Sequence, residues 1–234
     1  MADSILIERR YRGPPDSGNG GYVSGRLAAH IEGPALVRLQ VPPPLGVEME
    51  VRNAGAGVEL VHAGIVVAWA RPSAVSLQVP AAPSHAEAEA AARAYRGFYS
   101  HPFPSCFVCG PDRGAGDGLR IFPGKIAGTH VVASPWVPDA SLADGAGIVR
   151  REFLWSALDC PGGFAFELQE GNAVLLGELA ASLSGNVEAG ERCVAIGWEI
   201  GREGRRHYTG TALFSESGEC RGVARATWFE ARNT

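Results

Sequence analysis

Two short segments of the sequence carry residue types that suit chemistry at a carbonyl group. The first, DSGNGGYVSG (16–25), places Asn19 ahead of two glycines and an apolar stretch. The second, FLWSALDCPGG (153–163), places Asp159 at the end of an apolar run, directly before Cys160. A glycine-rich segment can be a flexible linker, a tight turn or the start of a helix, and the start of a helix offers free N–H groups to an anion or a carbonyl oxygen.

The glycine-rich segment is expected to open a helix. The sequence YVSGRLAAHI (22–31) has apolar residues at roughly helical spacing, and Asn19 is a favoured N-cap residue. Such a helix would present the N–H groups of Gly20, Gly21 and Tyr22 to a carbonyl oxygen, with Asn19 as cap or additional donor. The simpler alternative is that Asn19 only caps the helix and the glycines only form a turn.

Asp159 is the strongest candidate for a general base or a nucleophile. A carboxyl group at the edge of a buried helix is partly desolvated, and desolvation raises its pKa toward the range useful for proton transfer. The alternatives are that Asp159 caps a broken helix or pairs with an arginine. Cys160 is a weaker nucleophile candidate, since no histidine is near it in the sequence to activate it.

Other polar residues have weaker claims to a role. Ser24 could hydrogen-bond a substrate from the helix, whereas Asp16 and Ser17 are common turn formers. The segment CFVC (106–109), with His101 nearby, suggests zinc, but a structural zinc site usually combines two ligand clusters. The remaining cysteines fall on other expected elements, so we expect no metal and no cofactor.

The predicted elements recur in the same order in two halves of the chain. Strands are expected at 4–12 and in four segments within 35–79, and a second helix at 84–100 is capped by Ser84. After an irregular segment at 101–118, strands at 118–124 and 129–137 precede a helix within 141–160, capped by Ser141 or Asp144. Four long strands are then expected at 173–185, 192–204, 205–218 and 220–232.

Composition places the chain among ordinary globular proteins and excludes several classes. Hydrophobic residues make up 46% of its 234 residues, enough for a sizeable core. The net charge of −4 gives no basic footprint for nucleic acid, and no apolar run is long enough to span a membrane. The N-terminus does not resemble a signal peptide, and five cysteines without disulfide spacing favour a reducing compartment, so we expect a cytoplasmic protein.

The motifs resemble those of a known superfamily. CFVCGPDRGAGDGLRIFPG (106–124) resembles the segment ahead of many hot-dog thioesterase domains, and FLWSALDCPGGFA (153–165) looks like the central helix of such a domain with its acid, Asp159. GNGGYVSG (18–25) resembles the entry to the central helix of a second unit. The chain therefore resembles a double hot-dog protein of the acyl-CoA thioesterase superfamily.

The resemblance implies an α+β fold of two hot-dog units, each an antiparallel curved sheet wrapped around a central helix. We expect the units at 1–100, with a trailing helix, and at 101–234. In hot-dog enzymes the acid of one unit meets the helix N-terminus of the other, which predicts Asp159 opposite Gly20, Gly21 and Tyr22. Only one competent site is expected, because the helix of the first half carries no acid.

The expected function is hydrolysis of an acyl-CoA-type thioester. The alternatives are a non-catalytic acyl-binding protein and, less favoured, a hot-dog hydratase or dehydratase, whose usual histidine is not visible on either central helix. The sequence leaves open which acyl group is bound and whether the chain associates into homo-oligomers. It also leaves open which arginines would contact the phosphates of coenzyme A; the candidates are Arg113, Arg120, Arg150 and Arg151. Aromatic residues that could line an acyl tunnel, or simply form core, are Tyr22, Phe153, Trp155, Phe164 and Trp198.

Overall fold

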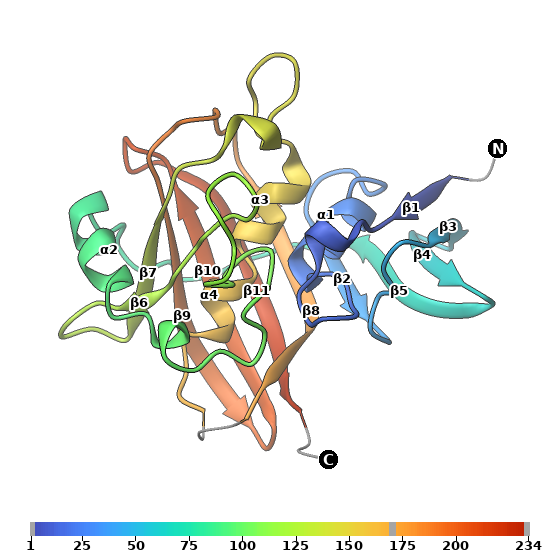
Figure 1. Ribbon diagram of the computed structural model, residues 1–234. Helices are drawn as coiled ribbons and strands as arrows, with labels where there is room; N and C mark the ends of the chain where they lie inside the picture. Colours follow the sequence, from blue (N-terminus) through green and yellow to red (C-terminus); the bar gives the residue numbers. More distant parts are fainter. Residues whose placement is uncertain (1–2, 169–171, 232–234) are drawn as a thin grey trace.

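The computed structural model describes residues 3–168 and 172–231. Across these residues an antiparallel sheet of eleven strands forms the body of the molecule (Figure 1). The order across the sheet is β1 (Ser4–Leu6), β3 (Glu48–Ala54), β4 (Gly57–His62), β5 (Ile65–Pro72), β2 (Ala35–Leu39), β8 (Val174–Leu183), β11 (Cys220–Glu230), β10 (Arg206–Phe214), β9 (Cys193–Glu203), β7 (Val131–Trp136) and β6 (Gly124–Lys125). Strands from before and after residue 100 therefore occupy opposite ends of one sheet.

The two ends of the sheet join where β2 pairs with β8. The pairing is antiparallel and runs from Ala35 opposite Ala181 to Arg38 opposite Glu178. Val37 and Leu179 are fully buried there, and the ion pair between Arg38 and Glu178 covers the end of the junction at 3.0 Å. Backbone hydrogen bonds and side-chain burial thus make the two halves one continuous structure.

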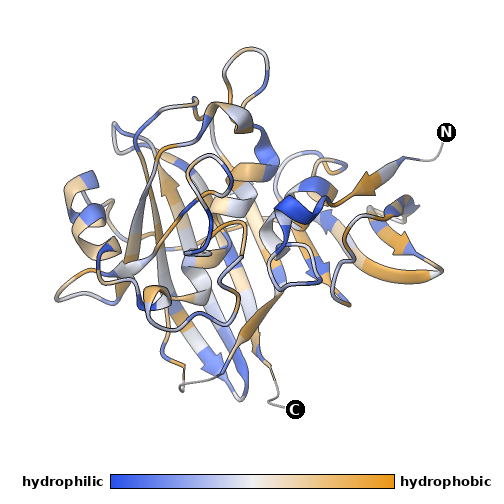
Figure 2. Cartoon of the chain, viewed as in Figure 1, coloured by the Kyte–Doolittle hydropathy of each residue, from blue (hydrophilic) through white to orange (hydrophobic). Residues whose placement is uncertain are grey.

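Two helices lie side by side near this junction, one from each half. These are α1 (Gly20–Ala28) and α3 (Arg151–Ala157), and α3 is followed by the short α4 (Cys160–Gly163). Phe153, Leu154 and Val23 are among their fully or almost fully buried side chains. Both polar and apolar segments occur along α1 and α3 in Figure 2, as expected for helices that bury one side.

The helix α2 (His85–Ala92) packs at the far end of the sheet, against β6 and β7. Ser84 and Glu87 form the capping box expected from the sequence. The sequence predicts this helix as the trailing element of the first half, whereas in space it covers strands of the second half. The predicted boundary between the two units at residue 100 therefore divides the sequence, but α2 packs across it. The boundary stays a prediction. None of the helices among the described residues has the length and apolar character needed to cross a bilayer.

Several elements differ from the sequence-based expectation. Residues 74–79 belong to no strand, and residues 118–123, ahead of β6, are irregular. Only 4–6 of the expected first strand pairs in the sheet, and a 3-10 helix follows at Arg9–Tyr11.

The helix expected within 141–160 begins only at Arg151, and neither Ser141 nor Asp144 caps it. The Asp144 side chain instead accepts hydrogen bonds from Ala146 N and Ile148 N, at 2.9 and 3.1 Å. Those bonds hold a tight loop in which Gly147 has a φ of 80°. Local side-chain bonding at Asp144 therefore competes with the helix, as is common for this residue type.

Candidate active site

The glycine-rich segment before α1 is a fixed turn rather than a linker. Gly13 N donates to Ser17 O at 2.9 Å, and Gly18 N donates to Pro43 O at 2.9 Å. Asn19 N donates to Tyr11 O at 2.8 Å, so the backbone is tied on both sides immediately before the helix begins. Ser17 and Asn19 are both buried, which completes the restraint of this turn.

Asn19 caps α1 and also reaches across to the other half of the chain. Its Oδ1 accepts a hydrogen bond from Tyr22 N at 2.9 Å, which satisfies one of the free N–H groups of the first turn. Its Nδ2 donates to Asp159 Oδ2 at 2.8 Å. The amide therefore performs two tasks, and the cap fixes the orientation in which Nδ2 meets the carboxylate.

Asp159 lies at the break between α3 and α4 and faces the N-terminus of α1. Its Oδ2 accepts a second hydrogen bond from Gly21 N at 2.9 Å. Its Oδ1 is buried and has no hydrogen-bond partner among the described residues. The structure thus brings together Asp159, Asn19 and Gly21 from two halves of the chain, and one carboxylate oxygen is held while the other is left unpaired.

Burial raises the pKa of Asp159 to about 7, because desolvation penalises the carboxylate. The hydrogen bond from Gly21 N opposes this rise, and so does the hydrogen bond from the Asn19 side chain. The positive end of a helix dipole is also a favourable place for a negative charge. At neutral pH both the acid and the carboxylate are therefore accessible to this side chain.

Glycines allow the two helices to come close enough for these bonds. A Cβ atom at Gly21 would lie 2.5 Å from Asp159 Cβ and 2.9 Å from Trp155 O. A Cβ at Gly25 would lie 2.7 Å from Glu152 Cα. Both glycines therefore pack directly against α3.

A cavity of about 450 Å³ opens at this contact. Asn19, Gly20 and Asp159 line it together with residues 99–103, 106 and 109 and, further along the chain, residues 163, 164, 167, 168, 172 and 174–176. Its remaining walls are largely apolar and include Phe103, Phe164, Leu175, Leu176 and Trp228. The volume and the mixture of apolar walls with a few polar groups are typical of a small-molecule site.

Of the four residues that the sequence suggested for substrate contact, Gly20 lines this cavity, whereas Gly21, Tyr22 and Ser24 do not. The side chain of Tyr22 is stacked on Tyr11 at a centroid distance of 4.1 Å and is 3% exposed. Ser24 is fully buried and does not line the cavity. Of α1, only its first residue, Gly20, lines the cavity.

The N–H groups at the start of α1 are also less free than expected. Gly21 N donates to Asp159 and Tyr22 N donates to Asn19 Oδ1, so neither is available to a carbonyl oxygen. Gly20 N has no hydrogen bond within the described residues, and Gly20 lines the cavity. The expected three-donor group is therefore reduced to one backbone donor.

Most of the aromatic residues and arginines that we expected to contact the acyl group or the phosphates of coenzyme A do not line the cavity. Of the five aromatic candidates only Phe164 lines the cavity, while Tyr22, Phe153 and Trp155 pack between the helices and Trp198 lies on β9. None of the four candidate arginines lines it. Arg113, for example, is buried and donates to Ser105 O and Arg10 O, at 2.8 Å each, which holds the 101–118 segment in place.

The contribution of the 101–118 segment to the cavity is not predicted from the sequence. His101, Cys106 and Cys109 line it, and Cys160 joins them from α4. The Cys-x-x-Cys motif indicated that this segment could form part of a site. Cys160 is far from the motif in the sequence, so its closeness to Cys106 and Cys109 in space could not be predicted. Burial lowers the pKa of His101, and its Nδ1 accepts a hydrogen bond from Phe103 N at 2.9 Å.

The two tasks of Asn19 can be separated by substitution. Asn19→Ser keeps a good N-cap but removes the amide donor to Asp159, whereas Asn19→Ala removes both. Both variants lose the donor to Asp159, so the cap appears in the difference between them: Asn19→Ala should have a free energy of unfolding lower than that of Asn19→Ser by about 0.5–2 kcal/mol. Denaturant unfolding of the wild type and both variants would show this difference. An equal loss in both variants would contradict the capping role.

Solved structures resemble this chain over almost its whole length. No protein-family model matches the sequence, and no curated protein matches it. An acyl-CoA thioesterase II from Mycobacterium marinum matches with a TM-score of 0.62 and 12% identity, over 99% of this chain and 93% of the other. A hot-dog protein of unknown function from Alicyclobacillus acidocaldarius matches with a TM-score of 0.60 and 10% identity, over 99% and 93%. The chain has the double hot-dog fold.

Within this double hot-dog fold, α1 and α3 are the two central helices, and the contact between Asp159 and Gly21 lies where they meet. A tesB protein of Mycobacterium avium subsp. paratuberculosis is also similar, with a TM-score of 0.58, 12% identity, and coverage of 92% of this chain and 88% of the other. At such identities the likeness concerns the fold, and the chemistry of the site has to be argued from its own residues.

Proposed function

We propose that this double hot-dog protein hydrolyses an acyl-CoA-type thioester in the cavity at Asp159. The observation that carries the proposal is the composite contact at the α1 N-terminus. Gly21 N and Asn19 Nδ2 hold Oδ2 of Asp159, while Oδ1 is buried and unpaired beside the cavity. A carboxylate fixed by one oxygen presents the other in a defined direction, which is what proton abstraction or nucleophilic attack requires.

In the proposed reaction Asp159 acts at the thioester carbonyl carbon. As a base, it takes a proton from a water molecule whose oxygen adds to that carbon; as a nucleophile, it adds directly and water later cleaves the anhydride. In both routes the C–S bond breaks, the thiol leaves with a proton, and the acyl group becomes a carboxylic acid. Both routes need the same unpaired oxygen on a restrained Asp159.

Gly20 N is the proposed donor to the carbonyl oxygen. It belongs to the first turn of α1, so the helix dipole adds to the charge stabilisation as the oxygen becomes negative. The apolar walls at Phe164, Leu175 and Leu176 would hold the acyl group. Similarity to structures that include an acyl-CoA thioesterase II supports the choice of a thioester as the substrate.

The test is a panel of acyl-CoA substrates of short, medium and long chain, with aromatic acyl groups added, and a thiol reagent that detects released coenzyme A. We expect release for at least one acyl class, with saturation kinetics. If no member of the panel is hydrolysed, the enzyme proposal fails, and binding of the same compounds without turnover would favour an acyl-binding protein.

One observation favours a hydratase or dehydratase as the second candidate. His101 lines the same cavity as Asp159, although it lies on a loop rather than on a central helix. Such an enzyme would interconvert a 2-enoyl thioester and its 3-hydroxy derivative and would release no thiol. Following the enoyl absorbance alongside the thiol signal in the same panel distinguishes the two reactions.

A further inference from the structure

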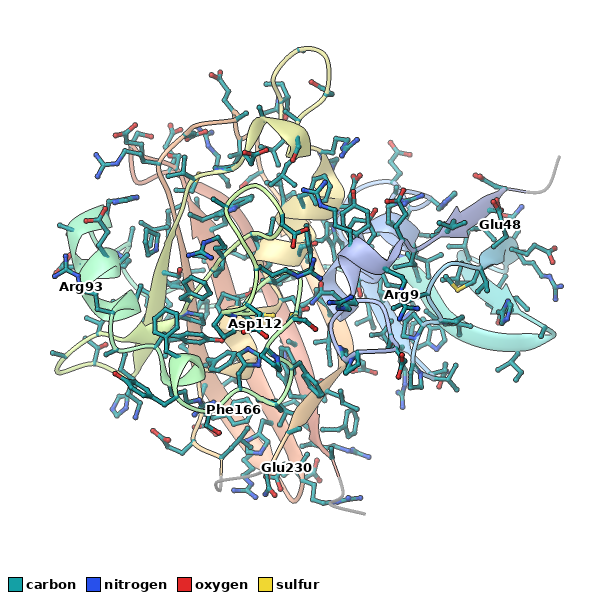
Figure 3. The ribbon with its side chains drawn as sticks, in the orientation of Figure 1. Arg9, Glu48, Arg93, Asp112, Phe166 and Glu230 are labelled. Carbon is teal, nitrogen blue, oxygen red and sulfur yellow. The ribbon has the colours of Figure 1, made fainter. Side chains whose placement is uncertain are left out.

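Three of the five cysteines meet beside the cavity. The Sγ atoms of Cys106, Cys109 and Cys160 all lie within 4.8 Å of one another, and those of Cys106 and Cys160 are 3.9 Å apart. All three side chains are buried, and all three line the cavity. In the view of Figure 3, sulfur atoms appear in the middle of the molecule, next to the label of Asp112. The other two cysteines, Cys193 and Cys220, lie on β9 and β11.

The spacing of these sulfur atoms suits a tetrahedral thiolate site. Zinc binds thiolates at about 2.3 Å, so two sulfur ligands on one tetrahedral ion lie about 3.8 Å apart. The distance of 3.9 Å between Cys106 and Cys160 is close to that value. Cys109 needs only a small rotation to join them, because its sulfur already lies within 4.8 Å of both.

The backbone around Cys106 and Cys109 is a tight turn that holds two of the sulfur atoms on one side. Gly110 N donates to Cys106 O at 2.9 Å, which closes the turn. A Cβ atom at Gly110 would lie 2.5 Å from both Cys106 N and Cys106 O, so only glycine fits there. A Cys-x-x-Cys-Gly turn of this kind supplies a pair of ligands in a fixed relative position.

The third sulfur comes from the element that follows Asp159. Cys160 begins α4, and its position is fixed because Thr211 Oγ1 donates to Leu158 O at 2.7 Å at the helix break. The three thiols thus converge from two rigid parts of the second half that are more than fifty residues apart in the chain. His101 is not an obvious fourth ligand, since its Nδ1 accepts a hydrogen bond and its proton is then on Nε2.

We propose that Cys106, Cys109 and Cys160 bind one thiophilic divalent cation, Zn²⁺ being the ion whose geometry fits best, with the fourth coordination position open to the cavity. Binding replaces three S–H protons by three S–Zn bonds; the protons go to solvent, and no atom changes oxidation state. Hard cations such as Mg²⁺ and Ca²⁺ prefer oxygen ligands and are not expected.

The ion would tie the segment carrying Cys106 to the start of α4, directly after Asp159. Asn19 Nδ2 lies 3.8 Å from Cys106 Sγ and 2.8 Å from Asp159 Oδ2, so the metal would lie close to the composite contact. Our expectation from sequence that the chain binds no metal would then be wrong. The proposal does not depend on thioester hydrolysis, and its test does not use that reaction.

The test uses the full chain, reduced and stripped with a chelator under anaerobic conditions, then titrated with Zn²⁺ against a chromophoric competitor. One equivalent should bind, and Mg²⁺ should not displace it. Co²⁺ in place of Zn²⁺ should give the sulfur-to-cobalt charge-transfer absorption and the visible bands of a tetrahedral thiolate site. Binding of Zn²⁺ should also raise the Tm of the protein.

Cys106→Ser and Cys160→Ser should each abolish tight binding, and Cys220→Ser is the matched control that should retain it. Alkylation of the wild type provides a readout that needs no variant. Zn²⁺ should protect Cys106, Cys109 and Cys160 from the reagent and leave Cys220 unprotected. The proposal is overturned if the fully reduced protein retains no equivalent of Zn²⁺, if Co²⁺ gives no charge-transfer band, or if Zn²⁺ protects a different set of thiols.

Discussion

Asp159→Asn is expected to lower kcat/KM for thioester hydrolysis by roughly 10²–10⁴-fold, the usual contribution of a positioned acid–base group. The substitution is close in shape, because the amide oxygen can take the place of Oδ2 and accept from Gly21 N and Asn19 Nδ2. What it removes is the unpaired carboxylate oxygen, Oδ1, of a residue that lines the cavity. Steady-state thiol release by the wild type and the variant measures the effect.

The control for Asp159→Asn is Asp112→Asn. Asp112 is an exposed acid on the 101–118 segment, labelled in Figure 3, and it does not line the cavity. It should retain wild-type kinetics. Circular dichroism and thermal unfolding should show that both variants are folded. Full activity in folded Asp159→Asn would remove Asp159 from the reaction, even if the protein proves to be a thioesterase.

Gly21→Ala is expected to have the second-largest effect, on stability and on activity together. An alanine Cβ would lie 2.5 Å from Asp159 Cβ and 2.9 Å from Trp155 O, so α1 and α3 must move apart. Overpacking of this kind usually costs about 1–3 kcal/mol. That loss would appear although alanine is favoured over glycine in helices by about 1 kcal/mol.

The separation of the helices should also lengthen the hydrogen bond from Gly21 N to Asp159 Oδ2, so the activity of folded Gly21→Ala should fall as well. Denaturant unfolding and thiol release on the same samples would report both losses. Gly201→Ala is the control, because a Cβ there meets nothing within 4 Å. Wild-type stability and activity in Gly21→Ala would show that the close helix contact is not needed.

The sequence was sufficient to predict the features that depend on local patterns. Ser84 and Glu87 form the expected capping box, and the four long strands after residue 173 occur within a few residues of the expected bounds. Asn19 caps the expected helix, because N-cap preference depends on only a few neighbouring residues. Asp159 faces that helix as the family resemblance implied, a relation that periodicity alone could not provide.

The features that the sequence did not predict depend on contacts between distant residues. The meeting of Cys160 with Cys106 and Cys109 requires the fold, since α4 and the 101–118 segment converge only in three dimensions. The N–H groups of Gly21 and Tyr22 were expected to be free, but the side chains that occupy them come into reach only through tertiary packing and the cap. The helix α3 begins later than predicted because hydrogen bonds to the Asp144 side chain stabilise a loop where the sequence pattern indicated a helix.

The central claim is that Asn19 of the first half and Asp159 of the second half act as one site. A double-mutant cycle in kcat/KM tests it most directly, with wild type, Asn19→Ser, Asp159→Asn and the double variant assayed on the best acyl-CoA substrate. Hydrogen bonds to charged groups contribute about 1.5–3 kcal/mol, so Asn19→Ser alone should lower kcat/KM by roughly 10–100-fold. We predict that Asn19→Ser has little further effect once Asp159 is replaced, because its amide then has no carboxylate to position. Independent, multiplying losses in the double variant would contradict a composite site.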